Sequence, residues 1–167
     1  MDRKLELPEL IFKFKNDNIV LLYTAEDTET GETLAICSMD RRSGINIIPI
    51  DEYKNIARTD DIYSNCEPTN VAPCYYRHFK GKWYSVLQVV RNKKSSVDYV
   101  IYKAMYGNKK IYARPLDMFL SLTDTKKHPK ATQKYRFMSL NELKDVLGQD
   151  KVSKMFSDEV SDNSLNL

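Results

Sequence analysis

Basic side chains alternate with aromatic ones in the middle of this chain of 167 residues, a combination suited to binding phosphate. Residues 76–84 read YRHFKGKWY, and residues 106–115 read YGNKKIYARP. Arginine presents a planar, charged donor fork, and the residue before a proline is held extended. Aromatic rings beside such cations offer stacking faces for bases. The candidate ligand-binding residues are therefore Arg77, His78, Lys80, Trp83, Tyr106 and Arg114.

These residues also have a structural interpretation. Arg114 is placed to pair with Asp117 or with an acidic residue of the first half of the chain. The tyrosines are equally suited to a β core with hydrated hydroxyls, and His78 to a structural hydrogen bond instead of a role as a base. The sequence leaves both interpretations open.

A second group of basic residues lies in the loops predicted for the second half of the chain. Its members are Arg91, Lys93, Lys94, Lys109, Lys110, Lys127 and Lys130. Acidic residues concentrate in the first half and the tail, so the chain is electrically asymmetric although its net charge is only +3. Such a basic half is typical of a phosphate-binding surface. Solvated loop tips, or docking on the acidic half of a neighbouring molecule, produce the same pattern.

The motifs that would indicate an enzyme or a metal site are missing from the sequence. It contains no Gly-rich phosphate loop, GxSxG or HExxH motif, and the acidic residues 26–32 lack EF-hand spacing. Two histidines are too few for a usual zinc site. Cys74 and His78 are four residues apart on extended chain, a poor arrangement for a nucleophile and its base. We therefore expect a protein that is not an enzyme and uses no cofactor or metal.

Cysteine usage favours a reducing compartment, and hydropathy favours a soluble protein. The three cysteines form no CxxC motif, and pairing of Cys66 with Cys74 stays open against idle thiols. No apolar run reaches the roughly 20 residues that span a bilayer. We expect a soluble cytoplasmic protein, located in the host cytoplasm if a phage encodes it.

The elements that must position the candidate residues are mainly β-strands. Residues 75–119 hold the densest aromatic and β-branched runs, broken by FKG, NKKSS and YGNKK, and an earlier segment repeats this order. Placing Phe14 on Phe79 aligns Leu22 with Leu87 and Ile36 with Ile101. With one residue inserted in the YGNKK loop, residues 49–53 (PIDEY) align with residues 115–119 (PLDMF), so that Tyr53 falls on Phe119. This alignment predicts an internal duplication.

The chain divides into five segments under this interpretation. Residues 1–57 form a degenerate β repeat that ends in a helical turn with Asp51 as its N-cap, and residues 58–74 form a linker. Residues 75–138 form the second β repeat. A helix at 139–156 starts with a capping box of Ser139 and Glu142, and residues 157–167 form a frayed tail.

The second repeat, over residues 74–140, resembles a family of bacterial and phage domains of unknown function, numbered 1653. The matching motifs are YRHFKG at 76–81, YSVL at 84–87, VIY at 100–102, MYG at 105–107, RPLDMF at 114–119 and RF at 136–137. The resemblance implies a small, strongly bent antiparallel barrel similar to SH3-like barrels. The predicted fold is therefore mainly β, with two tandem small SH3-like antiparallel β-barrel repeats and a short C-terminal helix.

Each repeat departs from the family pattern at a different place. The second has the basic turn RNKKSS at 91–96 where the family usually has His-Ser-Glu-Thr. The first keeps a turn of that kind, EDTETGE at 26–32, but has Lys13 in place of His78 and Ile48 in place of Arg114. Either one site is assembled across the repeats, or the first repeat is mainly a scaffold.

We therefore expect a non-catalytic binding module whose second repeat holds a phosphate-bearing ligand, nucleic acid or a nucleotide. One alternative is a phage-type protein–protein inhibitor of a host protein, for example an anti-defence protein. Another is a sponge that sequesters a nucleotide signal in a pocket between the repeats. The Lys-, Asn- and Tyr-rich composition fits a phage or firmicute source. The sequence leaves the ligand or host partner and the oligomeric state open.

Overall fold

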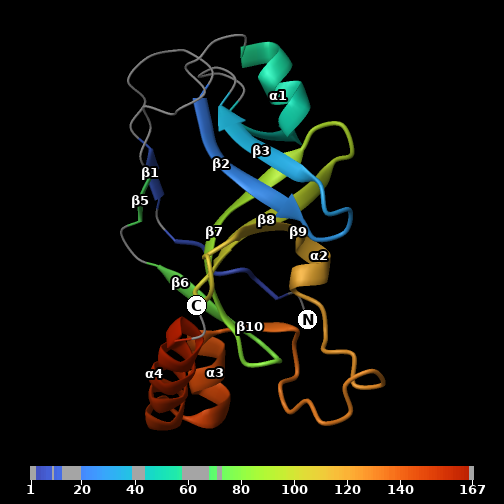
Figure 1. The fold of residues 1–167 in the computed structure, drawn as a ribbon. Coiled ribbons are helices and arrows are strands. Elements are labelled where there is room, and N and C mark those ends of the chain that lie inside the picture. The colour runs from blue at the N-terminus through green and yellow to red at the C-terminus, as the bar shows by residue number, and fades with distance from the viewer. Residues whose placement is uncertain are drawn as a thin grey trace.

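The computed structural model describes residues 3–8, 10–12, 20–38, 44–57, 68–70 and 73–165. Strands dominate it (Figure 1). The strands are β1 (Leu10–Phe12), β2 (Val20–Asp27), β3 (Thr33–Ser38), β4 (Ile45–Pro49), β5 (Pro68–Asn70), β6 (Cys74–His78), β7 (Trp83–Asn92), β8 (Val97–Ala104), β9 (Ile111–Pro115) and β10 (Phe137–Ser139). The helices are α1 (Ile50–Ala57), α2 (Leu116–Phe119), α3 (Leu140–Leu147) and α4 (Gln149–Leu165).

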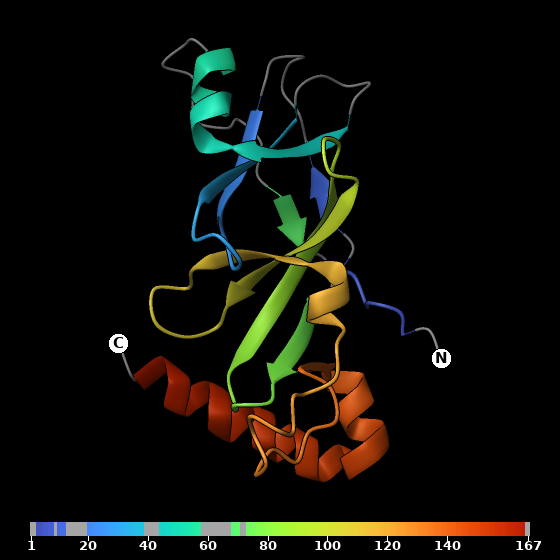
Figure 2. The same cartoon turned by 90° about the vertical axis from the view of Figure 1, so that its right-hand side faces the viewer.

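Eight strands form one open sheet in the order β10-β6-β7-β8-β9-β2-β3-β4, while β1 pairs with β5 separately. Neighbouring strands are antiparallel except β2 and β9, which pair in parallel through Glu26 with Tyr112 and Asp27 with Ala113. The predicted mainly β class is thus confirmed. The two predicted repeats, however, share one sheet, and this sheet is not closed into a barrel. The pairing of β2 with β9 joins the two halves, because it covers two strand edges that separate barrels would expose. Figure 2 shows α1 at one end of the molecule and α3 and α4 at the other.

The two halves of the sheet share one hairpin register. Each long hairpin carries one bulge, at Leu22 in β2 and at Leu87 in β7, and the sequence alignment places these residues on one another. The strand pairs on either side of the bulges correspond as well: Leu21–Cys37 and Tyr23–Ile36 in the first half, Val86–Tyr102 and Gln88–Ile101 in the second. A bulge fixes where a strand bends, so both hairpins bend at the same place.

The hydrophobic cores follow the same correspondence. One core lies between the halves and includes Ile36 and Ile101, both fully buried. Each half has a further core: Tyr53 packs with Ala35 and Cys37 in the first, and Phe119 packs with aromatic residues in the second. A further core of the second half lies around Trp83, beneath α3 and α4.

The helix ends confirm one predicted cap and differ from two other predictions. Ser139 and Glu142 form the predicted capping box. Helix α1 begins at Ile50, directly after Pro49, so Asp51 lies in its first turn instead of serving as the N-cap. Gly148 ends α3 with a φ of 91°, and α4 then continues to Leu165.

Helix α4 runs through residues for which the sequence predicts a frayed tail. Its side chains Phe156 and Val160 pack on the core around Trp83, and Glu159 pairs with Arg77. These tertiary contacts hold the helix in place. The predicted linker lies largely outside the described residues, as does Cys66, whereas Cys74 carries a free thiol.

Candidate anion-binding site

The candidate residues divide between two faces of the second half of the sheet. Successive side chains of a strand point to opposite faces, so Arg77 and His78 of β6 separate. We call inner face the side that carries the core of Tyr76, Val86, Val100, Tyr102, Phe119 and Phe137. His78 contacts Phe137 on this face, and Arg114 contacts Tyr102. Arg77 and Trp83 lie on the outer face, against α4.

On the outer face, Arg77 and Trp83 hold helix α4. Arg77 forms a two-pronged ion pair with Glu159, at 2.7 Å from Nε and 2.9 Å from Nη2, and its third nitrogen donates to Gln133. Trp83 is fully buried, with its ring 4.9 Å from that of Phe156 in an edge-to-face contact. Neither side chain presents a free face to a ligand in this structure, and their partners are too distant in sequence for local patterns to indicate.

The glycine of the YRHFKG motif is required by the backbone of its turn and lies against the Arg77–Glu159 pair. Gly81 has a φ of +95°, in the left-handed region that L-residues avoid, within the turn that joins β6 to β7. A Cβ atom there would lie 2.8 Å from Oε2 of Glu159. The motif thus fixes the turn and leaves room for the ion pair with α4.

On the inner face, Arg114 is oriented by a neutral partner. Its Nε donates a hydrogen bond of 3.1 Å to the Tyr102 hydroxyl, and its guanidinium carbon lies 5.9 Å from the centre of the Phe137 ring. None of the ion pairs found between described residues includes Arg114. Asp117, the partner that the structural interpretation offered, instead accepts a hydrogen bond from the backbone of Met118. Arg114 therefore retains donors for an incoming anion.

His78 stands beside Arg114 as a neutral side chain. Its Nδ1 accepts a hydrogen bond of 3.2 Å from the backbone N–H of Lys80, and its ring packs 5.0 Å from Phe137. The pKa of His78 is lowered to about 4, mainly by burial and then by the positive charges of Arg114, Lys80 and, more weakly, Arg136. A bound anion would offset these charges, so the surroundings of His78 favour negative charge.

Tyrosine hydroxyls and lysines continue the site beyond Arg114. The hydroxyls of Tyr84 and Tyr106 lie 2.7 Å apart, and burial is the main cause of a raised pKa at Tyr84. Lys82 Nζ lies 5.0 Å from the centre of the Tyr106 ring. Tyr106 is half-buried, so part of its side chain stays accessible beside a cation.

One aromatic pair of the site was not a sequence candidate. Phe79 lies between His78 and His128, with ring centres at 4.3 and 4.8 Å. The exposed side chain of Lys80 reaches to 5.9 Å from the Phe79 ring. Phe79 belongs to the YRHFKG motif and is identifiable there, but His128 comes from a loop with no periodic pattern.

The predicted basic surface separates into three places. Arg91 pairs with Asp98 at 2.8 Å, and Lys94 pairs with Glu52 of α1 at 3.2 Å. Lys110 pairs with Glu26 at 3.0 Å, and Lys109 lies next to it in the wall of a pocket of about 320 Å³. Lys127 and Lys130 are exposed in the loop that carries His128. These residues do not make one continuous surface.

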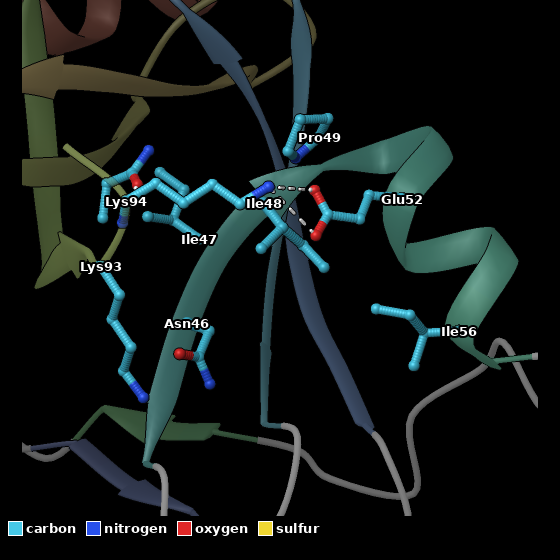
Figure 3. A pocket seen from close by; sticks show the side chains of 9 residues that line it. Asn46, Ile47, Ile48, Pro49, Glu52, Ile56, Lys93 and Lys94 are labelled. Atoms are coloured by element: carbon cyan, nitrogen blue, oxygen red, sulfur yellow. Dashed lines mark hydrogen bonds and ion pairs between the residues drawn. The ribbon is translucent and has the colours of Figure 1, made fainter.

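A pocket of about 220 Å³ lies between the two halves of the sheet (Figure 3). Its walls are β4, helix α1 and the turn after β7, with Ile47, Ile48 and Ile56 as apolar lining. Figure 3 shows Lys94 and Glu52 meeting beside Ile48. Lys93 also lines the pocket.

The described part of the chain contains neither a cluster of metal ligands nor a membrane-spanning helix. No three metal-ligating side chains come together among its residues. None of its helices is both long and apolar enough to cross a bilayer.

A family model matches the part of the chain that contains the site. Searches of curated proteins and of solved structures found no significant match. Residues 74–139 match the family model described as "Protein of unknown function (DUF1653)", which confirms the resemblance predicted for this segment.

Proposed function

We propose that the protein is a non-catalytic binding module that holds a phosphate-bearing ligand, nucleic acid or a nucleotide, on the inner face of its second repeat. Arg114 is the central contact, with Lys80 and His78 on one side and Tyr106 on the other. The observation that carries the proposal is the environment of Arg114. It is a half-buried guanidinium whose Nε bond goes to a neutral hydroxyl, and the charges that act on the neighbouring His78 are all positive. Phosphate oxygens match its remaining donors.

We further propose that the two halves are duplicated SH3-like repeats of which only the second carries a site. The shared bulges and corresponding cores support a duplication. At the position of Arg114 the first half has Ile48, which packs against the core of that half. At the position of Tyr102 it has the buried Cys37. The first half therefore serves as a scaffold, and each chain binds one ligand.

The test is a calorimetric titration with inorganic pyrophosphate, adenosine nucleotides and a mixed oligonucleotide at low ionic strength. We expect one ligand per chain, and an affinity for the oligonucleotide that falls as the salt concentration rises. Absence of heat with every phosphate compound would show that the proposal is wrong.

The pocket between the halves supports a second candidate, the nucleotide sponge. It lies between the repeats, as that alternative requires, and two lysines line it. Its volume of about 220 Å³ is below the roughly 300–1,000 Å³ of usual small-molecule sites. The Lys94–Glu52 pair also offsets part of its positive charge. We therefore place the ligand at Arg114. If the Arg114→Ala variant still binds the ligand and the Ile56→Trp variant does not, the binding site is the pocket instead.

A further inference from the structure

We propose that the site around Arg114 binds single-stranded nucleic acid, with bases stacked on its rings and phosphates held by its cations. This inference rests on the proposed phosphate-binding function and makes its ligand a polymer instead of a mononucleotide. It is carried by a row of neighbouring rings that has a cation near its start, in its middle and at its end. Stacking platforms combined with positive charge are how proteins hold single strands without reading their sequence.

The row of rings crosses the inner face from one loop to another. Ring by ring, it runs through His128, Phe79, His78, Phe137, Tyr84 and Tyr106, with separations between ring centres of 4.8, 4.3, 5.0, 5.6 and 5.6 Å. Phe137 is fully buried and supports its neighbours, whereas the other five are half-buried. Rings in this state are fixed by packing and are partly accessible at the surface, so we infer that a base can stack on them.

Each part of the row has its own cation. Lys80 Nζ lies 5.9 Å from the ring of Phe79, the second in the row, and Lys82 Nζ lies 5.0 Å from the ring of Tyr106, the last. The Arg114 guanidinium, 5.9 Å from the Phe137 ring, lies between them. The exposed side chain of Lys80 is long enough to swing from the Phe79 ring to a phosphate when a base takes its place. Positive charge thus accompanies the rings along the whole row.

The arrangement excludes a double helix and exceeds the size of a mononucleotide. In a duplex the bases are stacked on one another, so rings set in a protein face cannot reach them, while unpaired bases can splay out and stack. A mononucleotide would use one ring and one cation, but two ring–cation pairs lie on opposite sides of Arg114.

The test is a fluorescence-anisotropy titration of the whole protein with labelled oligothymidylates and oligouridylates of about two, four, eight and sixteen nucleotides. We expect affinity to rise by about tenfold or more between two and eight nucleotides, since small single-strand-binding folds cover about 4–16 nucleotides. A hairpin duplex of equal charge should bind at least about tenfold more weakly. The two oligonucleotide series show whether the natural strand is DNA or RNA.

Ring variants separate stacking from charge. Tyr106→Ala and Phe79→Ala should each weaken binding of the eight-nucleotide strand by about 5- to 100-fold, while Tyr106→Phe, which keeps the ring, should stay within about threefold of the parent. Lys151→Ala, which removes an exposed charge on α4, is the control and should leave the affinity unchanged. A thermal melt of each variant shows whether it folds.

Three outcomes would overturn the inference. If thymidine monophosphate and the longest strand bind with equal affinity, and Arg114→Ala loses both, the site binds phosphate but its ligand is not a polymer. Equal competition by polyglutamate and by an oligonucleotide of the same charge would indicate an acidic protein partner. Unchanged binding in both ring-to-alanine variants would show that the rings do not stack. A failure of all phosphate compounds to bind would instead remove the proposed function itself.

Discussion

The guanidinium carbon of Arg114 lies 5.9 Å from the centre of the Phe137 ring, although three strands separate β9 from β10 in the sheet. The second half of the sheet therefore curls until its first and last strands contribute to one site. The curl brings His78, which pairs with Phe137 across the β6–β10 ladder, into the field of Arg114. A flat sheet of the same strand order would leave these groups far apart.

Arg114 should account for much of the affinity for phosphate. Replacing it with alanine removes charged hydrogen bonds of about 1.5–3 kcal/mol, so we expect binding to weaken by about 10- to 150-fold. Arg114→Lys should recover only part of this loss, because a lysine cannot form a two-pronged contact. Calorimetry with pyrophosphate measures both variants, with Lys151→Ala as the matched removal of one surface charge. Equal affinities of Arg114→Ala and the parent protein would contradict the site.

His78 should make the protein less stable in mild acid. Its pKa is about 4 in the folded protein and about 6.5 when unfolded, so between these values the unfolded chain binds more protons. The contribution is complete above pH 6.5 and is lost as the pH falls to about 4; allowing for solvent screening, we expect about 2 kcal/mol.

Urea unfolding at several pH values measures this contribution. His78→Gln should show a shallower loss of unfolding free energy between pH 6.5 and 4 than the parent protein. Bound pyrophosphate should raise the pKa of His78, visible by NMR as a shift of its imidazole titration toward 6.5. Identical pH profiles of variant and parent would rule out a buried neutral histidine.

The Arg77–Glu159 ion pair should affect the docking of α4 and not the binding of ligand. Both side chains are mostly buried, at 17% and 23% exposure, so Glu159→Gln leaves a charge without its partner. We expect a loss of about 1–3 kcal/mol in unfolding free energy and faster amide exchange in α4. Asp158→Asn, at an exposed position on the same helix, is the control. A change in pyrophosphate affinity with intact folding would show that Arg77 acts in the site after all.

Corresponding core positions of the two halves should contribute similarly to the free energy of unfolding. Ile36 and Ile101 are both fully buried in the shared core. Each isoleucine-to-alanine change should cost about 2–5 kcal/mol, whereas Val97→Ala, at a partly exposed position, should cost less than about 1 kcal/mol. Chemical denaturation with one cooperative transition is expected for all three. Two separate transitions would show that the halves fold independently and do not share this core.

The sequence by itself determined the local features of this protein, such as its strands, bulges and helix cap. Alternating apolar residues and turn signals predict the β-strands, and the alignment of Leu22 with Leu87 corresponds to bulges that the structure has in the same places. The capping box at Ser139 is equally local, because it needs only two side chains three residues apart. The YRHFKG motif also identified His78, which lies beside Arg114.

Only the tertiary structure decided which candidates share a site. Arg77 and His78 are adjacent in the motif, yet strand geometry sends them to opposite faces, and Arg77 finds its partner Glu159 in a helix 82 residues away. Trp83 is buried for the same reason, beneath that helix. The parallel pairing of β2 with β9 joins the two halves into one sheet, and its register depends on how whole strands pack. Contacts between distant segments carry no local signal, so the composition of the site follows from the fold and not from the spacing of its residues.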